Sequence, residues 1–192
     1  MKLAERFHRW RATKGYGVHS PSAFRLIRHA IRPRRDVIYY GEEILEDLSS
    51  ESDSQAARGK VRKIQLSRAR ILLRMVAELQ PSYVWISPGL PALYTEAIRL
   101  AGGVIRVYDG AIFPDEISMA DMVVLHDCNP KKSELRKIIT PGRSLAAFGI
   151  NHKTALRVEE LLKGGVLLEA VDSLFAVCTR DEAAHVYRIS NI

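Results

Sequence analysis

The sequence predicts an α/β protein with a mostly parallel sheet, flanking helices and an antiparallel strand pair near the C-terminus. From about residue 60, short apolar runs alternate with amphipathic stretches, and this alternation is typical of a parallel sheet. It stops after Gly164 and Gly165, where three apolar runs follow with no helical stretch between them. The first part of the chain has a helical pattern instead. We therefore expect a helical N-terminal extension and linker over residues 1–59, and an α/β domain over residues 60–192.

The extension should contain two helices and a third segment. Apolar residues at helical spacing predict the first over residues 3–11. Ser20 followed by Pro21 is a helix start signal, and the helix that it opens should end at Pro33. A third segment, over residues 36–48, carries Tyr39, Tyr40, Ile44 and Leu48. The apolar side chains of the first two helices form too much surface to leave in water, so these helices should dock on the sheet domain or on a second subunit. The side chains concerned are Phe7, Trp10, Phe24, Ile27 and Ile31.

The remaining elements follow a polar segment at residues 49–54. A helix over residues 61–79, ended by Gln80 and Pro81, should cover one face of the sheet. Strands and helices are then expected to alternate at residues 83–87, 92–100, 104–108, 122–126, 133–139, 144–148 and 154–162. Three final strands are expected at residues 166–171, 174–179 and 185–189. A turn at residues 181–184 should join the last two into an antiparallel hairpin that closes the sheet.

The charge of the chain is concentrated at its start. The net charge is +7, yet residues 1–35 hold ten Lys and Arg against one acid, Glu5, which leaves the rest of the chain slightly acidic. A basic arm of this kind suits a nucleic acid, an acidic partner surface or a solvated helix face. Because no known nucleic-acid motif accompanies the charge, we do not favour nucleic acid as the partner.

Two further features of the sequence concern the cellular location of the protein and the redox state of its cysteines. The sequence has no apolar run long enough to span a membrane and no secretory signal pattern, so we expect no membrane association and a cytoplasmic location. Cys128 and Cys178 are far apart and lack the spacing of metal ligands or of a disulfide framework. We expect both thiols to be reduced.

One strand-to-helix turn, at residues 83–92, lies where an open α/β domain would cradle a nucleotide-like cofactor. Such turns use glycines that allow the backbone to approach the ligand at a helix N-terminus. This turn keeps only Gly89, and Pro88 and Pro91 stiffen it.

The order of these elements resembles that of the class I S-adenosylmethionine-dependent methyltransferases. In detail, the chain is similar to a bacterial O-methyltransferase-like subgroup at Gly17-Val18-His19-Ser20-Pro21, Tyr39-Tyr40, Ala120-Asp121-Met122-Val123-Val124-Leu125 and Ser144-Leu145-Ala146-Ala147-Phe148. The resemblance implies a Rossmann-like sheet and S-adenosylmethionine as the cofactor. The candidate cofactor-binding residues that it implies are Ser87, Gly89, Leu90, Asp109 and Gly110, with Asp109 placed to hold the ribose hydroxyls.

The chain also departs from this family. Trp85 stands where the first strand should end in an acid, and Ser87-Pro88-Gly89 replaces the glycine-rich turn. Residues 149–152 replace the paired aspartates of the subgroup. These departures argue against tight binding of S-adenosylmethionine.

A polar cluster is expected at the carboxyl edge of the sheet, where open α/β folds bind ligands. His126, Asp127 and Cys128 follow one strand, and Asn151 and His152 follow the next. Either imidazole could act as a general base toward a hydroxyl, so His126, His152 and Asp127 are the candidate catalytic residues. The alternative is that these residues cap helices and satisfy loop backbones. Their spacing is not a metal signature, so no metal is expected.

Three functions follow from these observations. The missing acid, glycines and aspartates favour a methyltransferase-like protein that has lost efficient cofactor binding and catalysis, and that acts as a binding or scaffold module. The second is an active O-methyltransferase with an unusual cofactor loop. The third is a protein that binds nucleic acid or an acidic partner through its basic arm. The small molecule or protein that it binds cannot be read from the sequence.

Overall fold

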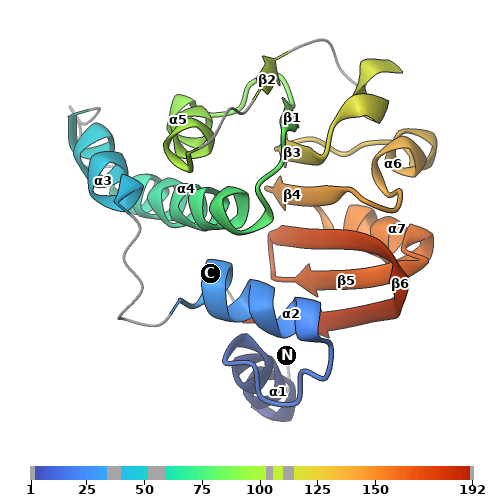
Figure 1. The fold of residues 1–192 in the computed structure, drawn as a ribbon. Helices are drawn as coiled ribbons and strands as arrows, with labels where there is room; N and C mark the ends of the chain where they lie inside the picture. The colour runs from blue at the N-terminus through green and yellow to red at the C-terminus, as the bar shows by residue number, and fades with distance from the viewer. Residues whose placement is uncertain (1–2, 34–39, 52–58, 103–105, 110–114, 191–192) are drawn as a thin grey trace.

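The computed structural model describes residues 3–33, 40–51, 59–102, 106–109 and 115–190 (Figure 1). The helical N-terminal part comprises α1 (Leu3–Thr13), α2 (Pro21–Leu26), the π-helix η1 (Ile27–Ile31), α3 (Gly41–Glu51) and α4 (Gly59–Leu79). The alternating part then comprises β1 (Tyr83–Ile86), α5 (Ala92–Leu100), β2 (Arg106–Asp109), the 3-10 helix η3 (Asp115–Met119), β3 (Met122–His126), α6 (Lys132–Ile138), β4 (Ser144–Phe148), α7 (His152–Leu161), β5 (Gly164–Glu169) and β6 (Ser173–Arg188). The predicted mixed α/β fold is confirmed.

The strands form one open sheet in the order β2-β1-β3-β4-β6-β5. The first four strands in this order are parallel to one another, with Val84 opposite Met122 and Met122 opposite Ser144. β6 lies antiparallel to β4 and places Ser173 opposite Phe148. The sheet is therefore parallel where the sequence alternates with helices, and it reverses direction at β6.

The long strand β6 bends around β5, as Figure 1 shows. In its first half Leu174 lies opposite Glu169 and Cys178 opposite Gly165, so this half runs antiparallel to β5. In its second half Ala184 lies opposite Gly165, and the register then advances in step with β5. The predicted antiparallel strand pair is present as β5 with the first half of β6. The predicted hairpin between residues 174–179 and 185–189 is wrong, because β5 lies between them.

Two glycines allow β5 to enter this bend. A Cβ on Gly165 would lie 2.0 Å from the carbonyl oxygen of Val177, and the residue has a φ of +100°. A Cβ on Gly164 would lie 2.6 Å from the carbonyl oxygen of Glu182. Both neighbours are backbone atoms, so side chains at these two positions would separate β5 from β6.

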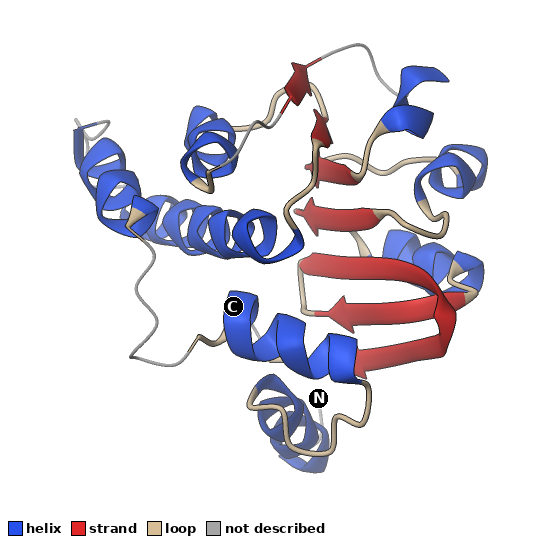
Figure 2. Cartoon of the chain, viewed as in Figure 1, coloured by secondary structure: helices blue, strands red, loops and turns tan. Residues whose placement is uncertain are grey.

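Helices cover both faces of the sheet (Figure 2). On one face α2, η1, α4 and α5 bury a core that includes Ile86, Val124 and Phe148 of the sheet. On the other face α6 and α7 pack on a second core that includes Leu125 and Leu145. The prediction that α4 covers one face of the sheet is confirmed.

The second predicted helix begins as expected. The Ser20 side chain caps α2 by accepting a hydrogen bond from the Ala23 amide, and Pro21 occupies the first turn. Ile27 and Ile31 are buried in the core with α4, which confirms that this helix docks on the sheet domain.

Three aromatic side chains that were expected to dock remain largely exposed. Phe7 is 55% exposed, and Trp10 and Phe24 are each 46% exposed. The Phe7 and Trp10 rings stack on each other with centroids 5.8 Å apart, and the Lys14 ammonium lies 4.2 Å from the Trp10 centroid. These contacts cover part of the aromatic surface locally, while the face of α1 that includes Thr13 turns toward the end of the chain.

The two ends of the chain are joined by hydrogen bonds. The Ser190 amide donates to the Thr13 hydroxyl over 2.8 Å, and the Ser20 hydroxyl donates to Glu182 over 2.6 Å. The Tyr187 hydroxyl accepts a hydrogen bond from the Ser20 amide over 3.2 Å. The N-terminal helices are thus fastened to the last strand segment. Within the described ranges, no helix combines the length and apolar character needed to cross a bilayer.

Candidate functional site

The turn after β1 is held by its own hydrogen bonds. Ser87 is buried, its amide donates to the Val124 carbonyl over 2.9 Å, and its hydroxyl accepts from the His126 amide over 3.0 Å. Gly89 adopts a φ of +77°, and Leu90 packs against the core beneath the turn. Of the predicted cofactor-binding residues in this turn, Ser87 already uses its hydroxyl to bind the neighbouring strand.

Trp85 is fully buried on the face of the sheet that α6 and α7 cover. The resemblance placed a cofactor-binding acid at this position. Since the indole fills the interior of a core, a carboxylate here would be a buried charge and not a ligand for a ribose.

The two remaining predicted cofactor residues lie at the end of β2. Asp109 is the last residue of this strand and lies opposite Ile86 of β1. Its backbone is therefore at the same edge of the sheet as the turn after β1. Gly110 lies outside the described residues.

His126 ends β3 at the carboxyl edge of the sheet, and its side chain is only 12% exposed. Its Nδ1 lies 3.5 Å from the exposed carboxylate of Asp127. Asp127 has a φ of +46°, and its side chain lies over Gly149, where a Cβ would be 1.7 Å from Oδ1. The glycine thus lets the strand ends of β3 and β4 meet, and it holds Asp127 beside His126.

The surroundings of His126 favour its neutral form. Burial lowers the pKa of His126, and the Arg68 guanidinium lowers it further, while the Asp127 carboxylate acts in the opposite direction. A neutral imidazole is the form that can accept a proton. Burial also raises the pKa of the Cys128 thiol, which disfavours the thiolate needed for nucleophilic chemistry.

Three residues that the sequence analysis did not single out complete this cluster. The Tyr94 ring from α5 is fully buried and meets His126 and Phe148 edge-on, with centroid distances of 5.5 and 5.2 Å. The Tyr94 hydroxyl makes no hydrogen bond of normal geometry within the described part of the chain; burial raises its pKa to about 12, and the nearby Arg68 side chain acts in the opposite direction. Arg68 of α4 lies 5.9 Å from the Phe148 ring centroid and forms an ion pair with Asp172.

No sequence pattern joins these side chains. Arg68 is one of several arginines along α4, and its partner Asp172 lies 104 residues further along the chain. Tyr94 falls on the buried face of α5, where an aromatic residue is ordinary core. Only the topology of the sheet brings them to the carboxyl edge beside His126.

The second predicted histidine belongs to a different cluster. Asn151 caps α7 by accepting from the Thr154 amide, and His152 is the first residue of that helix. The Nδ1 of His152 lies 3.3 Å from Glu169, a buried carboxylate that also pairs with Arg188 at 3.0 Å. The described contacts therefore tie His152 to the C-terminal strands, whereas His126 contacts Asp127 and Tyr94. No group of three or more potential metal ligands forms among the described His, Cys, Asp and Glu residues.

The electrostatic environment of His126 gives a pH-dependent prediction. Arg68→Gln should raise the pKa of His126, because it removes a nearby positive charge, and Asp127→Asn should lower it. Since the folded-state pKa lies below the unfolded value, the free energy of unfolding should fall as the pH drops through about 6.5. NMR titration of the His126 ring tests both shifts, with Arg157→Gln on α7 as the control. Equal titration curves for all three variants would contradict the proposed environment.

Comparison of the chain with protein-family models, with curated proteins and with solved structures found no match.

Proposed function

We propose that this protein is a methyltransferase-like α/β protein that has lost efficient S-adenosylmethionine binding and catalysis and works as a binding or scaffold module. The strand order supports the scaffold, because the family that the sequence resembles also ends in an antiparallel strand pair. Here the antiparallel half of β6 lies between β4 and β5. The parallel strands before it would then be a Rossmann-like sheet with its ligand edge at the ends of β1, β3 and β4.

The observation that carries the loss of function is that the described side chains at the ends of β1, β3 and β4 are already engaged with one another. The Tyr94 ring is completely buried against His126 and Phe148, and the Ser87 hydroxyl is bound to the His126 amide. A cofactor that used the Ser87 hydroxyl or the Tyr94 ring would first have to break these contacts. Their loss would subtract from its binding free energy.

The donors that remain are too few to offset this cost. Pro88 and Pro91 provide no amide hydrogen, and Trp85 provides no carboxylate. Charge-assisted hydrogen bonds to Asp109 would contribute about 1.5 to 3 kcal/mol each. Micromolar affinity requires about 8 kcal/mol.

The corresponding experiment is calorimetric titration of the full chain with S-adenosylmethionine and with S-adenosylhomocysteine up to millimolar concentrations. We expect no saturable heat from either ligand. Asp109→Ala is the matched variant and should behave like the unmodified chain. Micromolar binding that Asp109→Ala abolishes would overturn the proposal.

That outcome would favour the second candidate, an active O-methyltransferase. One observation supports it: His126 is held in its neutral form beside Asp127 at the carboxyl edge, as a general base toward an acceptor hydroxyl should be. Methyl transfer depends mainly on close positioning of two reactants, so an altered turn is compatible with this chemistry.

The third candidate, binding of nucleic acid or an acidic partner by the arm, is supported by the exposed Phe7 and Trp10 beside Arg11 and Lys14. If a nucleic acid binds there, the affinity for a single-stranded oligonucleotide should fall steeply between about 50 and 200 mM salt, as it does for complexes that depend on phosphate contacts. Fluorescence anisotropy at several salt concentrations measures this dependence. A salt-independent affinity would exclude phosphate contacts by the arm.

A further inference from the structure

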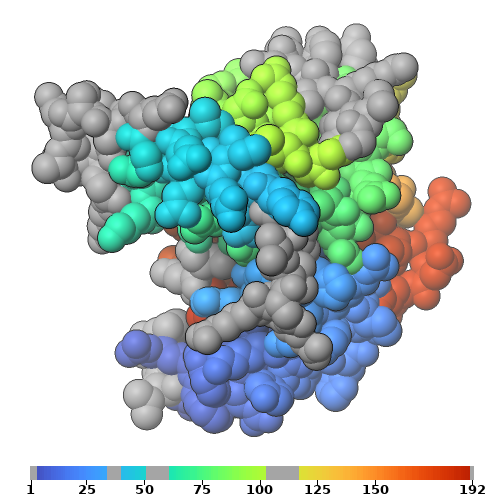
Figure 3. Space-filling view, turned by 60° about the vertical axis from the view of Figure 1, so that its left-hand side comes forward, coloured from blue at the N-terminus to red at the C-terminus, as the bar shows by residue number. Residues whose placement is uncertain are grey.

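A cavity of about 510 Å³ lies along α4, away from the carboxyl edge of the sheet. Its walls are one stripe of α4, the end of η1 and the side of α3. The N-terminal helices (blue) and α3 (cyan) appear on the same face of the molecule in Figure 3. On α4 the stripe includes Lys63, Leu66, Arg70 and Arg74, which are spaced three or four residues apart and so share one face of the helix. The volume is in the range of small-molecule sites.

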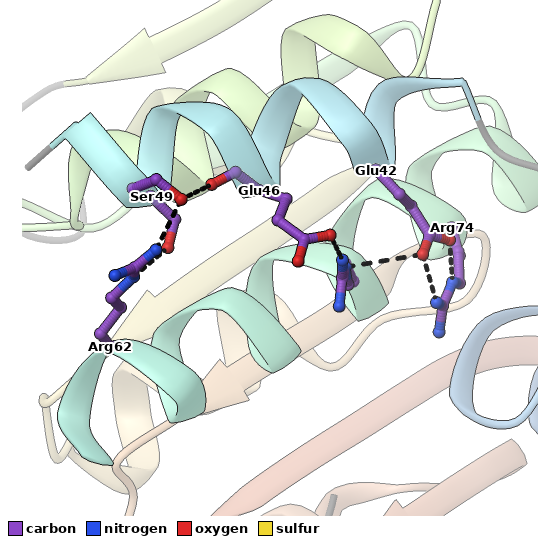
Figure 4. Close-up of polar contacts among 7 residues, drawn as sticks. Glu42, Glu46, Ser49, Arg62 and Arg74 are labelled. Atoms are coloured by element: carbon purple, nitrogen blue, oxygen red, sulfur yellow. Dashed lines mark hydrogen bonds and ion pairs between the residues drawn. The ribbon is translucent and has the colours of Figure 1, made fainter. Parts of the chain in front are cut away.

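Two of the four cations that line the cavity are already neutralised. Arg74 forms a bidentate pair with Glu42, with distances of 2.6 and 2.7 Å, and Arg70 binds Glu46 over 2.6 Å (Figure 4). These pairs clamp α3 onto α4, and Arg62 adds hydrogen bonds to Ser49 and Ser50 at the far end of α3. The clamp fixes the width of the cavity.

The other two cations, Arg32 and Lys63, are exposed, and no carboxylate of the described residues pairs with either. Among the described residues, the cavity lining and its two ion pairs thus hold four cations and two carboxylates, an excess of two positive charges. Arg70 is not a third free cation, because its Nε lies 3.6 Å from Oε2 of Glu42 while its other end binds Glu46. Arg32 and Lys63 favour an anion at this end of the cavity.

Apolar side chains contribute to the lining of the cavity beside its cations. Ile31 and Ile71 are 3% and 2% exposed and belong to the core of the sheet domain, and Leu66 packs partly buried against them. On an ordinary protein surface, cationic side chains extend into water or lie along one another's aliphatic parts. Here cations and apolar side chains line one cavity, so a ligand with an anionic head and an apolar chain would match both.

We propose that this cavity binds a single-chain amphipathic anion, with its phosphate or carboxylate head at Arg32 and Lys63 and its chain over Ile31 and Leu66. The site is independent of the carboxyl edge of the sheet. Its existence therefore does not depend on whether S-adenosylmethionine binds.

The test uses the full chain and three probes: octyl phosphate, octanol and inorganic phosphate. Octyl phosphate should bind saturably in calorimetry. Octanol has only the apolar chain and inorganic phosphate has only the anionic head, so each should bind at least tenfold more weakly. Chemical-shift changes in an NMR titration should centre on Ile31, Leu66 and Ile71. Equal affinity for octyl phosphate and inorganic phosphate, or shifts confined to another region, would overturn the proposal.

Variants separate this site from general attraction to a basic protein. Arg32→Gln combined with Lys63→Gln should weaken octyl phosphate binding at least tenfold, and Leu66→Asn should weaken it without changing the affinity for inorganic phosphate. Lys131→Gln combined with Lys153→Gln removes the same charge from exposed positions elsewhere and should leave binding unchanged. Because Arg32 and Lys63 are exposed and unpaired among the described residues, their variant should unfold at the same temperature as the unmodified chain. Equal loss of binding in both double variants would also reject the site.

Discussion

A chain that lacks residues 1–35 should fail to fold and should aggregate when expressed. The deletion removes Leu26, Ile27 and Ile31 from the core that α4 shares with the sheet. Burial of three such side chains is worth about 5 to 9 kcal/mol, which is comparable with the whole free energy of unfolding of a domain. It also exposes the apolar surface of α4 that these side chains cover. Size-exclusion chromatography and urea denaturation of the truncated chain measure the result.

Point variants identify which part of the extension matters. Ile27→Ala should lower the free energy of unfolding by about 2 to 5 kcal/mol, because it leaves a cavity in the core. Trp10→Ala should change it by about 0.5 kcal/mol or less, since that ring is largely exposed. A truncated protein that stays soluble, monomeric and equally stable would show that the extension does not stabilise the sheet domain.

Gly165→Ala should be among the most damaging single substitutions in the chain. The new Cβ would lie 2.0 Å from the Val177 carbonyl oxygen, and a non-glycine residue would be strained at a φ of +100°. The obstacle is backbone inside a strand pair, so it cannot move without breaking the contact between β5 and β6. We expect a loss of about 3 kcal/mol or more in the free energy of unfolding, measured by urea denaturation.

Gly142→Ala is the matched control. Gly142 has a φ of +84°, but no atom lies within 4 Å of the position that a Cβ would take. Its substitution should cost only the conformational strain, about 1 kcal/mol. Similar losses for the two variants would mean that the bend of β6 tolerates a side chain and that strain alone decides the effect.

Local signals in the sequence predicted much of this fold. Ser20 and Pro21 mark a real helix start, and the apolar runs at residues 83–87, 122–126 and 144–148 coincide with β1, β3 and β4. These features depend on side chains a few residues apart, so their pattern is visible in one dimension. Strand pairing is not visible in this way, because the apolar run at residues 174–179 predicts a strand but not the neighbour with which it pairs.

In the candidate site, too, local features could be predicted from the sequence and long-range contacts could not. Placing His126 and Asp127 at the end of β3 required only the length of one strand, whereas His152 was grouped with them because two parallel strands end at one edge. The structure instead turns His152 toward Glu169. The buried Tyr94 and the ion pair of Arg68 could not be anticipated, because their contacts arise from helices that meet only when the sheet is complete. The proposed catalytic role of His126 stays a prediction.

The hydrogen bonds between the two ends of the chain also set an order of events during synthesis. Thr13 is made early, but Ser190, to which it is bonded, follows 177 residues later. Ser20 likewise waits for Glu182, which is 162 residues further along the chain. Helix α1 and the N-cap of α2 must therefore leave the ribosome long before the C-terminal residues to which they are hydrogen-bonded have been synthesised. Contacts of such separation form slowly, and the exposed apolar surface is prone to aggregation in the interval, so this protein should depend on chaperones more than its length suggests.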